Sequence, residues 1–178
     1  LLAQTNTFVR FLATSYVNLT QKSLADAKIL DFGCGYGRVI RSLYYYTAPE
    51  NIVGVDPWDQ SVEQCRMHGI AQGIHQSDYL PTSLPLGSQR FDLIYAFSVF
   101  THLSERAVRQ SLATLRNYIS DRGVLVITIR PLEYWSYDRY IPAEQKPALE
   151  LSHRKQGFAF SPHHREKIDG DITYGDTS

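Results

Sequence analysis

The stretch from Ile29 to Ile40 constrains the fold of this 178-residue chain more than any other. An apolar segment with one acid, Ile29-Leu30-Asp31-Phe32, runs into a turn with glycine at every second position, and an apolar helical pattern follows directly. A buried strand, a tight turn and a helix start in this order bring backbone N–H groups close to a ligand. Glycine suits the turn because it has no Cβ to hold a ligand away and adopts positive φ angles at little cost.

The spacing of the glycines narrows the kind of ligand. Gly33, Gly35 and Gly37 form G-x-G-x-G, whereas dinucleotide folds favour G-x-G-x-x-G. Arg38 is the only basic residue nearby, and an acid, Asp31, stands two residues before the first glycine. This pattern favours a ligand with a cationic amino group over a diphosphate.

Two further segments place polar side chains at strand ends. Asp56 follows a second apolar strand, where a carboxylate can accept hydrogen bonds from both ribose hydroxyls of a ligand. A dinucleotide and a nucleoside with a cationic amino group both carry a ribose, so this acid does not distinguish them. Pro57 and Trp58 could flank the face of an adenine, and Asp78-Tyr79, past a third strand, supplies an acceptor and a ring near its edge. Asp31 and Asp56 are costly to bury without a partner, so we expect a ligand to pair with them.

Strand and helix patterns alternate along the chain, which predicts a doubly wound α/β sheet with helices on both faces. We expect Asp59 and Ser104 to cap two of the helices, and Asp121-Arg122-Gly123 to turn the chain into the fifth strand. The expected strands are 28–32, 52–55, 73–76, 91–97 and 124–129; the expected helices are 5–19, a helix after the glycine turn that ends before Pro49, 59–66, and a helix after Ser104 with the stripe Val108, Leu112, Leu115 and Ile119.

From Pro131 onward the periodicity is weak and aromatic residues crowd together. We expect an irregular cover over the carboxyl ends of the strands, with short strands at 158–160 and 172–174. The segment is too short for an independent domain. The tyrosines between Tyr134 and Tyr140 either hold an aromatic or sugar acceptor by stacking or seal the core.

Composition excludes several partners. The formal net charge is zero, so no basic excess indicates nucleic acid or an anionic membrane. No apolar run approaches the ~20 residues of a membrane span, and no signal peptide is visible. Two cysteines, without metal-ligand spacing, predict no disulfide framework and no metal site, and favour a cytoplasmic location. Because the chain begins at Leu1, we expect an excised part of something longer.

Four motifs resemble those of the class I S-adenosylmethionine-dependent methyltransferases, a Rossmann-like family, over about residues 5 to 130. They are ILDFGCGYGR at 29–38, VGVD at 53–56, SDY at 77–79 and FDLIYAFSVFTHL at 91–103. The resemblance implies a mainly parallel sheet in the order 3-2-1-4-5. The antiparallel strand pair that closes the family's sheet is not evident, so strand five is expected to be exposed or covered by a partner. The core would span 1–130, with an N-terminal helix in 1–22, and the cover 131–178.

The resemblance also implies where the cofactor binds. The methionine part of S-adenosylmethionine, or of the product S-adenosylhomocysteine, would lie against Asp31, Gly33 and Gly35. Asp56 would take the ribose and Asp78 the adenine amino group, while Phe97 would line the pocket after the fourth strand. The full predicted set is Asp31, Gly33, Gly35, Gly37, Asp56, Pro57, Trp58, Asp78, Tyr79 and Phe97.

His102 follows the fourth strand at the mouth of the predicted site. It is either a general base or a helix-start residue near Ser104, and the sequence weighs the two equally. The pair His163-His164 could also reach the site, although adjacent histidines in a proline-flanked loop are more often solvated.

The expected function is methyl transfer to a small-molecule acceptor, at a hydroxyl rather than at nitrogen or carbon. One alternative is a non-catalytic subunit that keeps the fold to bind the cofactor or a partner. Another is an NAD(P)-dependent oxidoreductase, which the glycine spacing disfavours. The sequence names neither the acceptor nor the oligomeric state.

Overall fold

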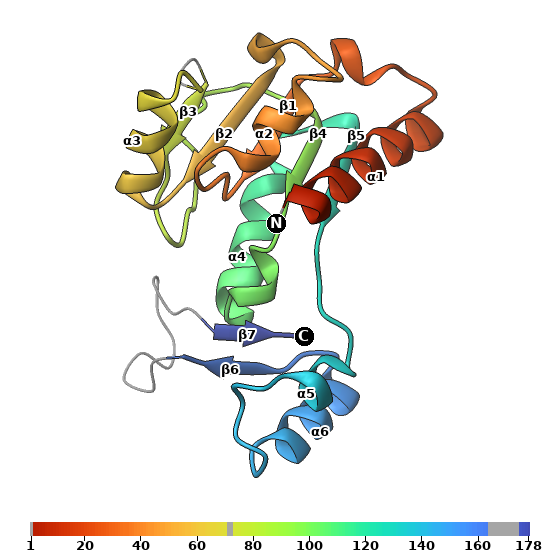
Figure 1. The fold of residues 1–178 in the computed structure, drawn as a ribbon, viewed down its shortest axis with the longest axis vertical. Coiled ribbons are helices and arrows are strands. Elements are labelled where there is room, and N and C mark those ends of the chain that lie inside the picture. Colours follow the sequence, from red (N-terminus) through yellow and green to blue (C-terminus); the bar gives the residue numbers. More distant parts are fainter. Residues whose placement is uncertain (1, 71–72, 164–174) are drawn as a thin grey trace.

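A computed structural model of the chain describes residues 2–70, 73–163 and 175–178. A parallel sheet of five strands fills the upper part of the molecule in Figure 1. Its order, β3-β2-β1-β4-β5, and the parallel pairing of every neighbouring strand confirm the predicted doubly wound sheet. The strands are β1 (Ile29–Phe32), β2 (Ile52–Asp56), β3 (Ile74–Gln76), β4 (Phe91–Ala96) and β5 (Ile119–Ile127).

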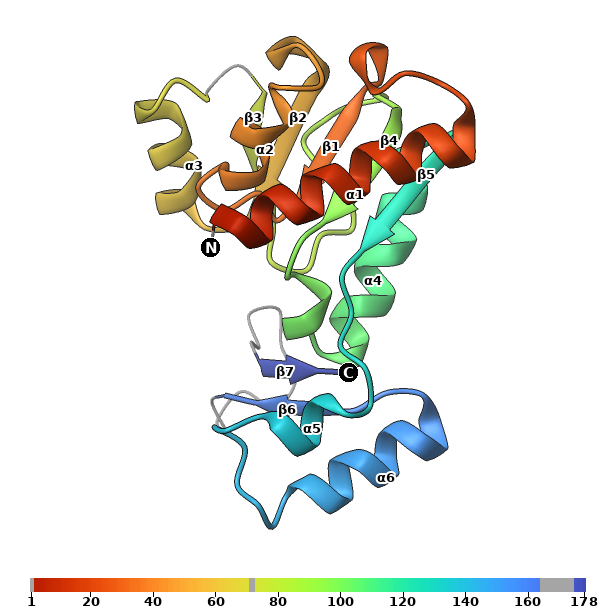
Figure 2. The same cartoon turned by 45° about the vertical axis from the view of Figure 1, so that its right-hand side comes forward.

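Helices cover both faces of this sheet, as Figure 2 shows. The α1, α2 and α3 helices lie on one face and α4 lies on the other. Successive β1 residues alternate between the faces: Ile29 packs in the cluster with α1 to α3, and Leu30 packs in the cluster with α4. Because both faces are covered, every β1 side chain is buried, and the strand is apolar apart from its acid. The helices are α1 (Leu2–Thr20), α2 (Arg38–Leu43), α3 (Asp59–Met67) and α4 (Glu105–Arg116), with short 3₁₀ turns η1 (Leu24–Asp26), η2 (Pro49–Asn51) and η3 (Phe100–His102).

Of the two predicted helix caps, one is confirmed. The Ser104 hydroxyl accepts a hydrogen bond from the Ala107 N–H at the start of α4. The prediction for Asp59 is wrong, because Asp59 is already the first residue of α3 and the preceding Trp58 has no capping side chain. The Trp58 N–H instead donates to Asp56, 2.9 Å away.

The start of β5 also differs from the prediction. Ile119 belongs to the strand rather than to the helix stripe, and Asp121-Arg122-Gly123 lie within the strand rather than in a turn. The helix ends earlier because Tyr118 is anchored: its hydroxyl bonds the backbone of Leu84, and its carbonyl accepts the Phe91 N–H. The register between β4 and β5 then shifts, which accommodates the extra residues as an irregularity in the ladder.

Residues 131 onward form regular elements, contrary to the prediction of an irregular segment. They are α5 (Tyr134–Tyr137), α6 (Lys146–Gln156), β6 (Phe160–Pro162) and β7 (Gly175–Thr177). Trp135, Ile141 and Ala159 form a separate small core. The α6 helix has no fully buried residue, so its sequence carries no strong apolar stripe. The strand predicted at 158–160 begins at Phe160, and the one predicted at 172–174 lies outside the described residues.

This C-terminal segment lies beyond the carboxyl ends of β4 and β5, with β7 next to η3 (Figures 1 and 2). Its two strands pair with each other as an antiparallel sheet of their own. Within the described part of the chain, β5 pairs with β4 alone, and Leu125 and Ile129 are exposed along or just after it. A partner on this edge stays a prediction.

Candidate active site

The glycine turn lies at the carboxyl ends of β1 and β2 and is held by the neighbouring strand. The N–H groups of Gly33 and Cys34 donate to the Val55 carbonyl at 2.8 and 3.0 Å. Gly33, Gly35 and Gly37 have positive φ angles of +77°, +51° and +68°. A Cβ added to Gly35 would meet no heavy atom within 4 Å. At Gly35 the turn therefore presents bare backbone to open space, as close approach of a ligand requires, whereas Gly33 and Gly37 pack closely against Val99 and Ile70.

Asp56 connects the end of β2 to this turn. Its carboxylate accepts hydrogen bonds from the N–H groups of Gly35, at 2.7 Å, and Trp58, at 2.9 Å. Burial raises the pKa of Asp56, and the two backbone hydrogen bonds oppose that rise. Each carboxylate oxygen accepts from one of the two N–H groups, so each oxygen keeps a second acceptor position for a ligand hydroxyl.

Asp31 is the deepest acid of the site, with 2% of its surface exposed. The Tyr95 hydroxyl donates to its Oδ2 at 2.8 Å. Burial raises the pKa of Asp31 to about 8, and the hydrogen bond from Tyr95 opposes that rise. Tyr95 is therefore a site residue that the sequence analysis missed. The register Asp31↔Tyr95 between β1 and β4 places them side by side, and a tyrosine in an otherwise apolar strand was the available signal.

The part of the site that is predicted to hold the adenine is exposed to solvent. Trp58 and Tyr79 are 52% and 42% exposed, and Asp78 is exposed as well. Pro57 directly follows β2, and its carbonyl accepts a hydrogen bond from Gln76 at the end of β3. The β2–β3 pairing thus brings these residues to one edge of the sheet.

Phe97, directly after β4, packs against α1. Its ring centroid lies 4.5 Å from that of Phe8. The guanidinium of Arg38, the first residue of α2, lies 5.3 Å from the Phe97 ring centroid. Phe97 therefore lies beside Arg38 at the end of the glycine turn, on the face of the sheet that α1 covers.

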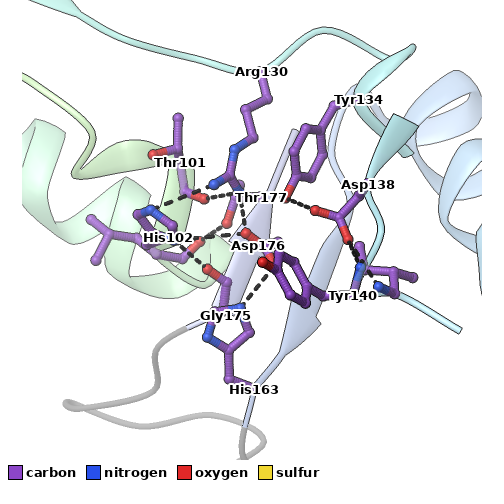
Figure 3. A network of polar contacts seen from close by, with 12 residues as sticks. Thr101, His102, Arg130, Tyr134, Asp138, Tyr140, His163, Gly175, Asp176 and Thr177 are labelled. Atoms are coloured by element: carbon purple, nitrogen blue, oxygen red, sulfur yellow. Dashed lines mark hydrogen bonds and ion pairs between the residues drawn. The ribbon is translucent and has the colours of Figure 1, made fainter. Parts of the chain in front are cut away.

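His102 lies apart from these residues, in η3 against β7 (Figure 3). Its Nδ1 is 2.7 Å from the Gly175 carbonyl oxygen, which can only accept, so Nδ1 carries the ring proton. Its Nε2 is 3.5 Å from Nη2 of Arg130. Burial, with Arg130 and His163 adding to it, lowers the pKa of His102 despite the bond to Gly175. The lowered pKa favours the neutral ring.

Asp176 is the centre of the network around His102 (Figure 3). It forms an ion pair with Arg130, and its Oδ2 is 2.7 Å from Nε2 of His163. Burial alone would raise the pKa of Asp176, but the hydrogen bond with His163 and the positive charge and hydrogen bond of Arg130 outweigh it and lower the pKa. Arg130 also donates to the Thr101 carbonyl and lies 4.2 Å over the Tyr134 ring. His164 lies outside the described residues.

A cavity of about 700 Å³ opens at this network. His102 and Arg130 contribute from the side of the sheet, and the C-terminal segment contributes the rest of the wall. Hydrogen-bond donors, acceptors and aromatic rings line it, and they include Tyr134, Tyr140, Gln145 and Asp176. Such a volume suits a small organic molecule.

The predicted residues thus fall into two groups, the cofactor set at the glycine turn and His102 at the cavity. Sequence analysis missed Arg130 and Asp176. They stand 28 and 74 residues after His102 in the sequence, so no local motif links the three. Among the described residues, no cluster of three or more histidine, cysteine or acidic side chains could hold a metal ion. None of the helices described is both long and apolar enough to cross a bilayer.

Solved structures share this fold, and several of them are described as methyltransferases. DesVI from Streptomyces venezuelae superposes with a TM-score of 0.58 at 16% identity, over 71% of this chain and 51% of that one. CalS10 from Micromonospora echinaspora, an amino pentose methyltransferase, superposes with a TM-score of 0.59 at 18% identity, over 71% of this chain and 51% of that one. The plantazolicin methyltransferase BamL superposes with a TM-score of 0.61 at 18% identity, over 90% of this chain and 65% of that one. The chain therefore spans about half of DesVI and CalS10, and at these identities the likeness concerns the fold.

Comparison with curated proteins gave no match. A family model described as "Methyltransferase domain" matches residues 30–127, more than half of the chain. The matched segment contains the glycine turn, Asp56, Phe97 and His102. The chain therefore belongs to the methyltransferase domain family, with the class I, Rossmann-like fold of the S-adenosylmethionine-dependent enzymes.

Proposed function

We propose that this chain, by itself or within a longer protein, transfers the methyl group of S-adenosylmethionine to a small-molecule acceptor. The observation that carries the proposal is the glycine turn, open at Gly35, with two buried acids, Asp31 and Asp56, beside it. A diphosphate would be repelled by such acids, whereas an amino acid joined to a nucleoside offers an ammonium group and ribose hydroxyls to them.

In this proposal the residues at the turn hold the cofactor. Asp31 and the backbone of Gly33 and Gly35 contact the amino acid part, and Gly37 lets the chain enter α2. Asp56 accepts from the ribose, while Trp58 and Tyr79, with Pro57 and Asp78, surround the adenine. Phe97 closes the side nearest β4. S-adenosylmethionine supplies a methyl group already activated by a positive sulfur, so the protein has mainly to position the acceptor and exclude water.

The cavity at His102 is the proposed acceptor site. Its donors and acceptors suit a polar molecule, and the Tyr140 ring, 92% exposed, offers a stacking surface. CalS10 is described as an amino pentose methyltransferase, which supports a small polar acceptor. We propose oxygen as the methylated atom, because a hydroxyl requires a base and the neutral His102 can serve as one. An acceptor hydroxyl would take the place of Arg130 at Nε2 of His102 and transfer its proton there.

A second candidate is a cofactor-binding subunit without catalysis. The observation that favours it is the β5 edge, which pairs on one side alone within the described residues and has exposed apolar side chains nearby. A partner covering this edge would complete the sheet. The nicotinamide alternative gains no support, since the turn has the G-x-G-x-G spacing and the chain belongs to a methyltransferase family.

Calorimetry with S-adenosylmethionine and S-adenosylhomocysteine tests the cofactor, and transfer of labelled methyl to a panel of sugars, phenols and short peptides tests the reaction. We expect binding of both forms and label in at least one hydroxylated acceptor. Folded protein that binds neither form would refute the proposal. Binding with no transfer to the panel would favour the subunit without catalysis.

A further inference from the structure

Ser98 has a strained backbone in the segment that leads from β4 to His102. Its φ angle is +61°, a left-handed conformation that residues with a Cβ adopt only at a cost in free energy. Because Ser98 is exposed, packing of its own side chain does not impose this conformation. Backbone strain of this kind persists where neighbouring contacts hold it, and it is concentrated at functional sites.

Thr128, directly after β5, holds Ser98 in the left-handed conformation. The Ser98 N–H donates to Oγ1 of Thr128 at 2.7 Å, and the Thr128 N–H donates to the Ala96 carbonyl at 3.2 Å. The pairing of β4 with β5 ends at Ala96 and Ile127, so these two bonds extend the contact beyond the last paired residues. The chain leaves the sheet at Ser98, and the threonine hydroxyl satisfies an N–H that the ladder no longer pairs.

The residue that follows, Val99, contacts the glycine turn and η3 together. Its side chain fills the space beside Gly33, where a Cβ on the glycine would overlap Cγ2 of Val99. Its carbonyl accepts the His102 N–H at 2.9 Å, a bond that forms the turn of η3. A rotation of the backbone at Ser98 would therefore move both contacts of Val99 at once.

The glycine turn is held in its shape independently of Val99. The Gly33 N–H donates to the Val55 carbonyl, and Asp56 accepts the Gly35 N–H, so the end of β2 fixes the turn. A displacement of Val99 would therefore leave the turn in place and change the position of η3 relative to it.

We propose, on the basis of the proposed methyl transfer, that Val99 positions His102 against the cofactor. Ser98 and Thr128 fix the direction in which Val99 lies. Transfer requires the acceptor oxygen about 3 Å from the methyl group, and the base has to reach the same oxygen. Val99 contacts the turn at Gly33 and the base at His102, so it sets the distance between them. It acts through these two neighbours and is a positioning residue.

The first test uses S-adenosylhomocysteine and needs no acceptor. In ¹H–¹⁵N spectra of the wild type, this ligand should shift the amide resonances of Gly35, in the turn, and of His102, whose N–H bonds Val99. In Thr128→Val, which removes the hydroxyl and keeps the branched shape, Gly35 should shift as before and His102 should lose most of its shift. A wild-type His102 resonance that does not respond while Gly35 does would overturn the inference and leave the cofactor site standing. Folded wild type that binds no S-adenosylhomocysteine would refute the proposed function itself.

The second test measures turnover with the acceptor that the labelling panel identifies. Thr128→Val and Val99→Ala should each lower kcat by about 10- to 100-fold, with the Kd of S-adenosylhomocysteine within about twofold of wild type. Thr128→Ser keeps the hydroxyl and should keep kcat. Ser98→Gly, added to Thr128→Val, should restore most of the lost kcat, because glycine adopts the left-handed conformation without the bond. The control Thr20→Val removes a hydroxyl that accepts the Lys22 N–H at the end of α1, and it should leave kcat unchanged.

Turnover also separates positioning from a merely structural role. Normal kcat in Thr128→Val would overturn the inference, as would a double variant with Ser98→Gly that stays as slow as Thr128→Val. Equal losses of kcat and of S-adenosylhomocysteine affinity would overturn it too, because they would show that the segment supports the turn itself. Melting temperatures of all variants confirm that each is folded.

Discussion

The carboxylate of Asp56 and the N–H of Gly35 are joined by a hydrogen bond of 2.7 Å, which connects the end of β2 to the middle of the glycine turn. The same carboxylate also receives the Trp58 N–H. An acid placed there by sequence analysis as a ribose acceptor is thus also a part of the turn's architecture. Binding of a ribose by Asp56 and the shape of the turn are therefore coupled.

We expect Asp56→Ala to abolish stabilisation by S-adenosylhomocysteine and to weaken the fold. The substitution leaves the N–H groups of Gly35 and Trp58 without their acceptor, which should lower the free energy of unfolding by about 1–3 kcal/mol. Thermal unfolding with and without S-adenosylhomocysteine measures both effects. Asp59→Asn, which removes an exposed charge three residues later, is the control. Its melting temperature should rise with S-adenosylhomocysteine as that of the wild type does. A rise in the melting temperature of Asp56→Ala with S-adenosylhomocysteine as large as that of the wild type would contradict the role assigned to the carboxylate.

Asp31 should make the free energy of unfolding depend on pH. The unfolded side chain titrates near pH 4, whereas burial raises the pKa of the folded one to about 8. Between these values the folded state holds a proton that the unfolded state lacks, so the contribution of Asp31 to stability is fully present below about pH 4 and is lost as pH rises to about 8, by up to about 1.4 kcal/mol per pH unit. Denaturant unfolding measures the free energy of unfolding of the wild type and Asp31→Asn across this pH range. The difference between the two free energies should change with pH by the amount given above. Tyr95→Phe keeps the acid and should keep the slope; identical slopes in wild type and Asp31→Asn would contradict the prediction.

The sheet could be predicted because its signals are local. The strands β1, β2 and β4 are short, mainly apolar runs bounded by a turn or an acid, and burial on both faces leaves little room for another interpretation. The cofactor set shares this advantage, since its residues stand at the ends of those runs. Parallel pairing then brings the ends to one edge of the sheet.

The cavity could not be predicted, because its residues are joined by tertiary contacts alone. His102 and Asp176 meet only after the C-terminal segment returns to η3, and Arg130 joins them from the end of β5. The α6 helix escaped prediction for a related reason, since a helix without fully buried residues shows no apolar stripe. A bulge such as the one in β5 likewise depends on its partner strand.

His102→Asn should separate catalysis from structure. An asparagine amide can still donate to the Gly175 carbonyl, so we expect near-normal stability, but it cannot take a proton and turnover should fall by about 10²-fold or more. Affinity for S-adenosylhomocysteine should not change, because His102 lies outside the cofactor set. Since burial lowers the pKa of His102, the acid limb of the wild-type turnover profile should lie below the ordinary histidine value of about 6.5. Steady-state kinetics across pH measure both, and normal turnover in His102→Asn would assign the residue to structure alone.

Asp176→Asn should weaken the attachment of the C-terminal segment to η3. The side chains of Arg130 and Asp176 are only 19% and 9% exposed, so removing the carboxylate charge leaves the Arg130 guanidinium largely buried without its counter-charge. Breaking a buried pair in this way costs about 3–5 kcal/mol, which equilibrium unfolding can measure. The exposed pair Glu105–Arg109 provides the control: Glu105→Gln should change stability by no more than about 0.5 kcal/mol. Because Arg130 and His163 both contact Asp176, hydrogen exchange in β7 should also speed up in Asp176→Asn. Equal stability of the two variants would show that Asp176 does not hold the segment in place.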